Sequence, residues 1–305
     1  MASLLSLPVE LQDRIIELVL LGVTRTPPAS VASARRNRWT DKEMPSQAIP
    51  GFHSWAYGPK HVRYERELGT NANVTGLLRA NRALNRQTKD AVARLWPGGV
   101  EYRLDVMVVD ERELWPTWLH VPVVAKRLGA VHITIRDFDS GSEGKGLTKG
   151  PGEIIDLVWC FYYLLERFFR CGLGRLAHPA KGQPYRGDCI LAIGNITMDF
   201  CGGDPRPGLC VQHDGEGPVL CRGEDVQPDD DYVAYDTHRR AWLADFVDSY
   251  LQSLARMCCD HAKYGLLLYE RVGTIDAKIQ AAQSWVVLLG DELARMEFRP
   301  TKDLE

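Results

Sequence analysis

The sequence predicts an α+β protein, with a small N-terminal helical unit ahead of a mixed sheet that is packed with helices. Apolar residues recur at helical spacing within residues 4–21 and 74–95. They alternate with polar residues over 100–108 and 131–136, the pattern of half-buried strands. A nearly continuous apolar run at 154–169 predicts a buried helix lying across the sheet. Helices followed by strands mixed with helices favour the α+β class.

The first expected helix carries one apolar stripe. Pro8 fits its first turn, where the missing N–H costs nothing. Leu11, Ile15, Leu18 and Val19 recur at helical spacing and therefore share a face. Charged residues fill the opposite face: Glu10, Asp13, Arg14 and Glu17. Such a stripe either packs on the protein's own domain or fits a groove in another protein.

Three short sequence motifs carry more information than the spacing of apolar residues alone. Residues 7–20 read Leu-Pro-x-Glu-Leu, then Arg-Ile-x-Glu-Leu-Val-Leu after two residues. Residues 77–82 read Leu-Leu-Arg-Ala-Asn-Arg, and residues 114–119 read Leu-Trp-Pro-Thr-Trp-Leu. Together they resemble the F-box-like proteins of filamentous fungi, in which the first motif opens the F-box and the second lies in a later helix. Asn81 stands where that family commonly has a cysteine.

The resemblance implies a non-enzymatic adaptor that links a client protein to a cullin–RING ubiquitin ligase. Its N-terminal helix would lay an apolar face in a groove of a Skp-type linker, the helix-in-groove mode of recognition. The residues that would contact the linker are Leu7, Pro8, Leu11, Ile15 and Leu18.

The predicted domain organisation follows from the same motifs. Residues 1–96 would form the F-box-like helical unit, interrupted by a long polar insertion at 22–72, and residues 97–305 would form the α+β domain that holds the client. A second hypothesis is a standalone α+β protein in which the N-terminal helix belongs only to the core. A third, less favoured, is an enzyme with an unrecognised site.

The remaining segments are expected to alternate between loops and helices. Residues 114–119 are expected to form a rigid aromatic connection whose tryptophans fill the core. Strands are expected at 190–200, a helix at 243–258, and a short turn and a last helix at 266–293. Gly-rich loops are expected at 139–151 and 201–231.

Composition excludes several classes of protein. Hydrophobic residues make up 45% and charged residues 25% of the chain, a balance typical of a folded globular protein. A net charge of −3 gives no reason to expect nucleic acid as a partner. Four charges interrupt the apolar N-terminal segment, which argues against a membrane span. The 8 cysteines are too dilute for a disulfide scaffold, so an intracellular location, cytoplasmic or nuclear, is expected.

Reactive groups are present, but none forms a strong motif. The best metal candidates are Cys201, Cys210, His213 and Cys221, because thiolates and imidazoles bind zinc. Cys210 and His213 have the spacing of a chelating pair, as do Cys258 and His261, but Cys201 and Cys221 stand alone and Cys258 belongs to the apolar stripe of an expected helix. Free cysteines are therefore favoured over a zinc site. The acidic groups at 110–113 and 229–231 favour solvated turns over catalysis. Neither G-x-S-x-G nor H-E-x-x-H occurs, and we expect no cofactor and no enzymatic activity.

Overall fold

The computed structural model of the chain confirms the predicted α+β class. It describes residues 4–24, 36–38, 62–65, 74–109, 113–138, 160–161, 164–165, 168–169, 192–201, 209–213, 218–222, 247, 268, 270–279 and 282–288. The helices with full bounds are η1 (Leu4–Ser6), α1 (Val9–Leu20), α4 (Thr75–Ala80) and α5 (Arg82–Leu95). The strands are β1 (Arg36–Arg38), β2 (Arg63–Glu65), β3 (Val100–Val109), β4 (Glu113–His120), β5 (Arg127–Phe138), β6 (Ala192–Cys201), β7 (Leu209–His213), β8 (Pro218–Arg222), β9 (Val272–Ile279) and β10 (Ala282–Leu288).

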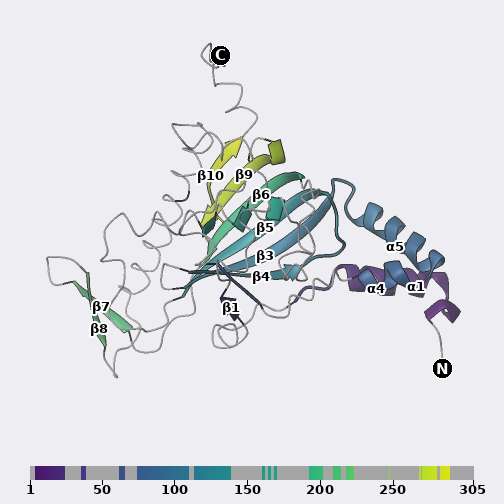
Figure 1. The fold of residues 1–305 in the computed structure, drawn as a ribbon, viewed down its shortest axis with the longest axis horizontal. Coiled ribbons are helices and arrows are strands. Elements are labelled where there is room, and N and C mark those ends of the chain that lie inside the picture. Colours follow the sequence, from purple (N-terminus) through teal and green to yellow (C-terminus); the bar gives the residue numbers. More distant parts are fainter. Residues whose placement is uncertain are drawn as a thin grey trace, which may run out of the picture.

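Six of the described strands form one mixed sheet in the order β10-β9-β6-β5-β3-β4 (Figure 1). The four central strands run parallel to one another, and the two edge strands, β4 and β10, run antiparallel to their neighbours. The connection between β4 and β5 passes the start of β3, where the Tyr102 hydroxyl donates to the Val123 carbonyl at 2.7 Å and accepts from the Ala125 N–H at 3.0 Å. Tyr102 is fully buried, so this connection is fixed to the core.

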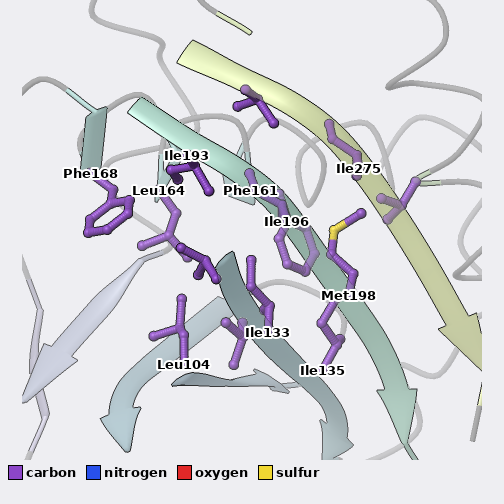
Figure 2. Packing of buried hydrophobic residues seen from close by; sticks show 14 of the residues in the cluster. Leu104, Ile133, Ile135, Phe161, Leu164, Phe168, Ile193, Ile196, Met198 and Ile275 are labelled. Carbon is purple, nitrogen blue, oxygen red and sulfur yellow. The ribbon is translucent and has the colours of Figure 1, made fainter. Parts of the chain in front are cut away.

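The main hydrophobic core covers one face of this sheet (Figure 2). The strands contribute alternate residues to it, among them Leu104, Ile133, Ile135, Ile193, Ile196, Met198 and Ile275. The described helical residues within 160–169 pack on these side chains through Phe161, Leu164, Phe168 and Phe169. The predicted strands at 100–108, 131–136 and 190–200 and the buried position of this helical segment are therefore confirmed. Such burial of alternate residues is what a period-two pattern predicts.

The prediction of an aromatic connection at 114–119 was wrong, because this segment is the edge strand β4. Pro116 lies opposite Val106 in its register, and an edge strand tolerates proline because only one side must supply N–H groups. Trp115 is 6% exposed, and Trp118 packs against the main core. The prediction that the tryptophans fill the interior is thus confirmed, although they do so from a strand.

The prediction of a last helix beginning near residue 275 was also wrong. Residues 272–279 and 282–288 form the antiparallel strands β9 and β10. Ile275 and Ala277 are buried, while Asp276 between them and Lys278 after them are half-buried, so the true period is two. The loop expected at 201–231 contains the antiparallel pair β7 and β8, and the insertion at 22–72 contains β1 and β2. The loop at 139–151 lies outside the described residues, as does the helix at 243–258 apart from the buried, helical Val247.

A row of glycines crosses the four parallel strands near their N-terminal ends. Gly129, Gly194 and Gly273 each follow a buried apolar residue and precede another two positions later, so the pattern apolar-Gly-x-apolar recurs in β5, β6 and β9. A Cβ atom on Gly129 would lie 2.6 Å from the Gly99 oxygen, and one on Gly194 would lie 2.7 Å from the Gly129 oxygen. Gly99 itself has a φ of +106°. The strands approach so closely here that a side chain would meet neighbouring backbone.

The helices α1, α4 and α5 gather at one end of the sheet and share a second, smaller core (Figure 1). Ile16 and Leu20 of α1 meet Leu84 and Ala91 of α5 in it. The break between α4 and α5 falls at Asn81, whose side-chain oxygen accepts the Leu84 N–H at 2.9 Å and so caps α5. The motif that resembles an F-box helix is therefore divided between two helices.

Candidate partner-binding surface

Helix α1 buries one face and leaves the opposite face open. Ile16 and Leu20 are fully buried in the small core, whereas Leu11 is 52% and Leu18 57% exposed. Residues 16 and 18 lie two positions apart, which places them on nearly opposite sides of a helix with 3.6 residues per turn. The stripe of Leu11, Ile15 and Leu18 is thus distinct from the stripe that attaches α1 to the protein.

The five residues expected to contact a linker share this surface to different degrees. Pro8, Leu11 and Leu18 are exposed, and Leu7 and Ile15 are half-buried. Ile15 is not among the side chains that pack against the small core, so its partial burial does not attach α1 to α5. The sequence pattern placed these residues on one stripe but missed the buried stripe of Ile16 and Leu20. Their spacing of four positions is the sequence signal that could have revealed it.

The start of α1 is held by an amide. Gln12, a polar residue at a buried position, donates from its Nε2 to the Leu7 carbonyl oxygen at 2.8 Å. Pro8 precedes the helix, and its carbonyl accepts the N–H groups of Leu11 at 3.0 Å and Gln12 at 3.1 Å. The Gln12 amide therefore ties the bend at Leu7, which follows η1, to the first turn of α1. This buried polar group is satisfied by a hydrogen bond, as buried polar groups usually are.

A charge pair joins the flank of α1 to α5. Arg94 Nη2 donates to Glu17 Oε1 at 2.8 Å, and Arg14 Nη1 donates to Glu17 Oε2 at 3.3 Å. The hydrogen bond from Arg94 lowers the pKa of the Glu17 carboxyl, and the same bond raises the pKa of Arg94. The Arg94 side chain is 52% exposed and the Glu17 side chain 22% exposed, so solvent screens the pair and its contribution to stability is small.

Exposed apolar side chains are concentrated around α1. Among the described residues, the large hydrophobic side chains that are exposed are Leu5, Val9, Leu11, Leu18, Leu21, Val23, Val124, Val286 and Leu288. Six of these nine lie within residues 5–23. Single exposed hydrophobic residues are ordinary, whereas a contiguous group on one element is typical of an interaction surface.

The segment after α1 is fastened to the end of β4. The Thr24 N–H donates to the Leu119 carbonyl at 2.7 Å, and the Nδ1–H of the buried His120 donates to the Gly22 carbonyl at 2.9 Å. The His120 ring also lies 6.2 Å from the Trp96 ring at the end of α5. Burial lowers the pKa of His120, an effect that outweighs the hydrogen bond to Gly22. This junction fixes the position of the helical unit relative to the sheet.

The second face of the sheet carries polar pairs beside a small apolar cluster of Met107, Val109 and Trp115. Asp105, which is 1% exposed, accepts two hydrogen bonds from Arg136 at 2.7 and 2.8 Å across the β3–β5 pair. The Asn195 amide donates to Asp276 at 2.9 Å across the β6–β9 pair. A bidentate buried pair of this kind positions neighbouring strands. The alternation of Asp105 with buried apolar residues was the sequence signal for this face.

The candidate zinc ligands lie on three different strands. Cys201 ends β6, while Cys210 and His213 lie in β7 and Cys221 in β8, where the register places Cys210 opposite Cys221. The side chains of these β7 and β8 residues lie outside the description, and no group of three or more His, Cys, Asp or Glu side chains in the described part could hold a metal ion.

The acidic group at 110–113 is described only at its last residue. Glu113 pairs with Arg63 of β2 and accepts the Trp115 indole N–H at 3.0 Å, which gives this carboxylate a structural role. The acidic group at 229–231 lies outside the described residues. In the described part of the chain, no helix combines the length and apolar character needed to cross a membrane.

No protein-family model matches this chain, and no curated protein or solved structure matches it. A proposal for its function therefore rests on the chain's own residues.

Proposed function

We propose that this protein is a non-enzymatic adaptor whose helix α1 docks a Skp-type linker of a cullin–RING ubiquitin ligase, while the α+β domain holds a client. The observation that supports this most directly is the open apolar stripe of α1. Leu11 and Leu18 are each more than half exposed, although the helix has a separate buried stripe that satisfies its attachment to the protein. The motif of residues 7–20, which resembles an F-box opening, lies on this helix.

The stripe has the form that helix-in-groove recognition requires. Leu11, Ile15 and Leu18 occupy positions i, i+4 and i+7, so they form one ridge about two turns long. Ile16 and Leu20 already hold the helix in place through its buried face, so binding of a partner costs little conformational entropy.

The alternative hypothesis, in which α1 belongs only to the core, makes a different prediction. If Leu11 belonged to the core, Leu11→Ala would lower the free energy of unfolding by about 2–5 kcal/mol, as truncation of a core side chain does. The exposure of Leu11 means that Leu11→Ala should cost much less than Ile16→Ala, which removes a fully buried side chain. Thermal melts of the two variants therefore show which stripe of α1 contributes more to the stability of the protein.

Co-purification with a Skp-type linker tests the adaptor hypothesis. Wild-type chain should retain the linker, and Leu11→Ala/Leu18→Ala should lose it while keeping a cooperative thermal transition close to that of the wild type. Val286→Ala/Leu288→Ala is the matched control, because both side chains are also exposed but lie on edge strand β10. The adaptor hypothesis fails if the wild type does not bind the linker, or if both double variants bind it as the wild type does.

A further inference from the structure

The outer face of α5 carries a row of positive charges. Arg82, Arg86 and Lys89 occupy positions i, i+4 and i+7, and all three are exposed. Arg79, also exposed, precedes them in α4. We call these four residues the basic stripe. Leu84, which lies two positions from both Arg82 and Arg86, is buried, so the stripe points away from the small core.

The positive charge of the basic stripe is largely uncompensated. Residues 74–96 hold five basic residues and one acidic residue, a net charge of +4, whereas the whole chain has −3 and its remainder therefore −7. Asp90 is the single acid in this segment, and it lies 4.0 Å from Arg86 with both side chains mostly solvent-exposed. The fifth basic residue, Arg94, forms an ion pair with Glu17. Such a local reversal of charge attracts an acidic partner.

The geometry of α4 and α5 presents these charges on a stable scaffold. Asn81 caps α5, and the Asn85 amide donates to the Leu78 carbonyl at 2.7 Å, which ties the end of α4 to the first turn of α5. At 1.5 Å per residue, Arg82 and Lys89 are about 10 Å apart along the helix axis. Carboxylates at helical spacing in a partner would match this separation.

From this placement we infer that the basic stripe is a second interaction surface, which binds an acidic polypeptide segment. It lies on the side of the helical unit opposite the apolar stripe of α1, because both stripes face away from the small core between the two helices. In Figure 1, α5 lies beyond the end of the sheet with α1 and α4. An acidic segment and a linker could therefore be bound together.

An acidic polypeptide fits this surface better than a nucleic acid does. The exposed positions of α5 are Arg82, Ala83, Arg86, Lys89, Asp90, Ala93 and Arg94, so this face offers no aromatic ring on which a base could stack. The net negative remainder of the chain also repels a long phosphate backbone.

Binding of a fluorescein-labelled oligo-glutamate peptide to the full chain, followed by anisotropy, tests the inference. Wild-type chain should bind saturably, with an affinity that falls as salt is added. Arg82→Glu/Arg86→Glu should weaken binding by roughly tenfold, since two attractive contacts become repulsive. Lys126→Glu/Arg127→Glu changes the net charge equally at two exposed residues outside the stripe and should bind like the wild type.

Several results would overturn the inference. They are the absence of peptide binding by the wild type, an equal loss in both double variants, and tighter binding of duplex DNA or of phosphatidylserine vesicles than of the peptide. If Arg82→Glu/Arg86→Glu fails to fold by circular dichroism, Arg82→Gln/Arg86→Gln is measured instead and should still lose affinity. Leu11→Ala/Leu18→Ala should retain peptide binding, so this surface and the adaptor hypothesis are tested separately.

Discussion

At the scale of single residues, glycines allow neighbouring strands to approach closely, and one asparagine ends a helix and begins the next. The glycines of β5, β6 and β9 let neighbouring backbones approach to distances that no Cβ atom would permit. Asn81 ends one helix and begins the next through its own side chain. These roles depend on backbone geometry rather than on hydrophobicity, so the pattern of apolar residues does not reveal them.

Two glycine substitutions should have opposite effects on stability. Gly129→Ala places a Cβ atom 2.6 Å from the Gly99 oxygen, a backbone atom that cannot move without shifting β3. We expect a loss of about 1–3 kcal/mol in the free energy of unfolding, as for overpacked interiors. Gly76→Ala, in α4, meets nothing within 4 Å and should leave stability unchanged or raise it by up to about 1 kcal/mol. Urea unfolding measures both, and equal effects would contradict the close approach.

At the scale of elements, the strands illustrate what the sequence reveals and what it conceals. β3 and β5 alternate apolar and polar residues without interruption over much of their length, so they were predicted correctly. Most of β9 was assigned to a helix beginning at Ile275. The buried residues Val272 and Ile275 lie three positions apart, with Gly273 between them, and three is also a helical spacing, so the alternation of the strand does not stand out here. The recurring pattern that β9 shares with β5 and β6 is only four residues long, too short to stand out before the register is known.

Helix α1 illustrates a different ambiguity. It has apolar residues on two faces, and periodicity alone does not decide whether Leu11 and Leu18 or Ile16 and Leu20 face inward. The buried Gln12 adds to this, since its amide is satisfied by the Leu7 carbonyl rather than by solvent. The sequence therefore places the candidate residues on one stripe, while their exposure required the three-dimensional structure.

The ion pair between β3 and β5 should contribute strongly to stability. Asp105→Ala removes the carboxylate that pairs with Arg136, whose side chain is 17% exposed. Breaking a buried pair from one side costs about 3–5 kcal/mol. Asp90→Ala breaks the exposed pair with Arg86 and should cost at most about 1 kcal/mol. Thermal melts of the two variants compare the pairs, and similar melting temperatures would mean that the β3–β5 pair is not a determinant of the fold.

At the scale of the whole molecule, a small contact region connects the helical unit to the sheet. Its described contacts include the Thr24–Leu119 and Val74–Pro122 backbone hydrogen bonds and the buried ring of His120. Val92 and Val123 also pack against both the main core and the small core. The charged groups that act on this ring are Arg103, which lowers its pKa, and Glu101, which raises it. Burial is the larger effect, and it makes the attachment of the unit dependent on pH.

The free energy of unfolding should therefore decrease in mildly acidic solution. His120 has a folded pKa below its ordinary value of 6.5, so the unfolded chain takes up a proton first as the pH falls. Stability should decline from about pH 6.5 down to the folded pKa and then level off with respect to this group. Urea unfolding of His120→Gln across this range should show a smaller slope. An unchanged slope in His120→Gln would contradict the assignment of this pH dependence to the buried ring.

The order of strands in the sheet has a consequence for the newly made chain. β6 lies at the centre of the sheet, yet its partner β9 begins only at Val272, long after β6 ends at Cys201. At roughly 5–20 residues per second, a ribosome needs on the order of several seconds to supply β9. During that time one edge of β6 has no partner, and an unpaired edge can pair with another nascent chain. Synthesis of β9 and β10 therefore ends the period in which this protein is most prone to aggregate.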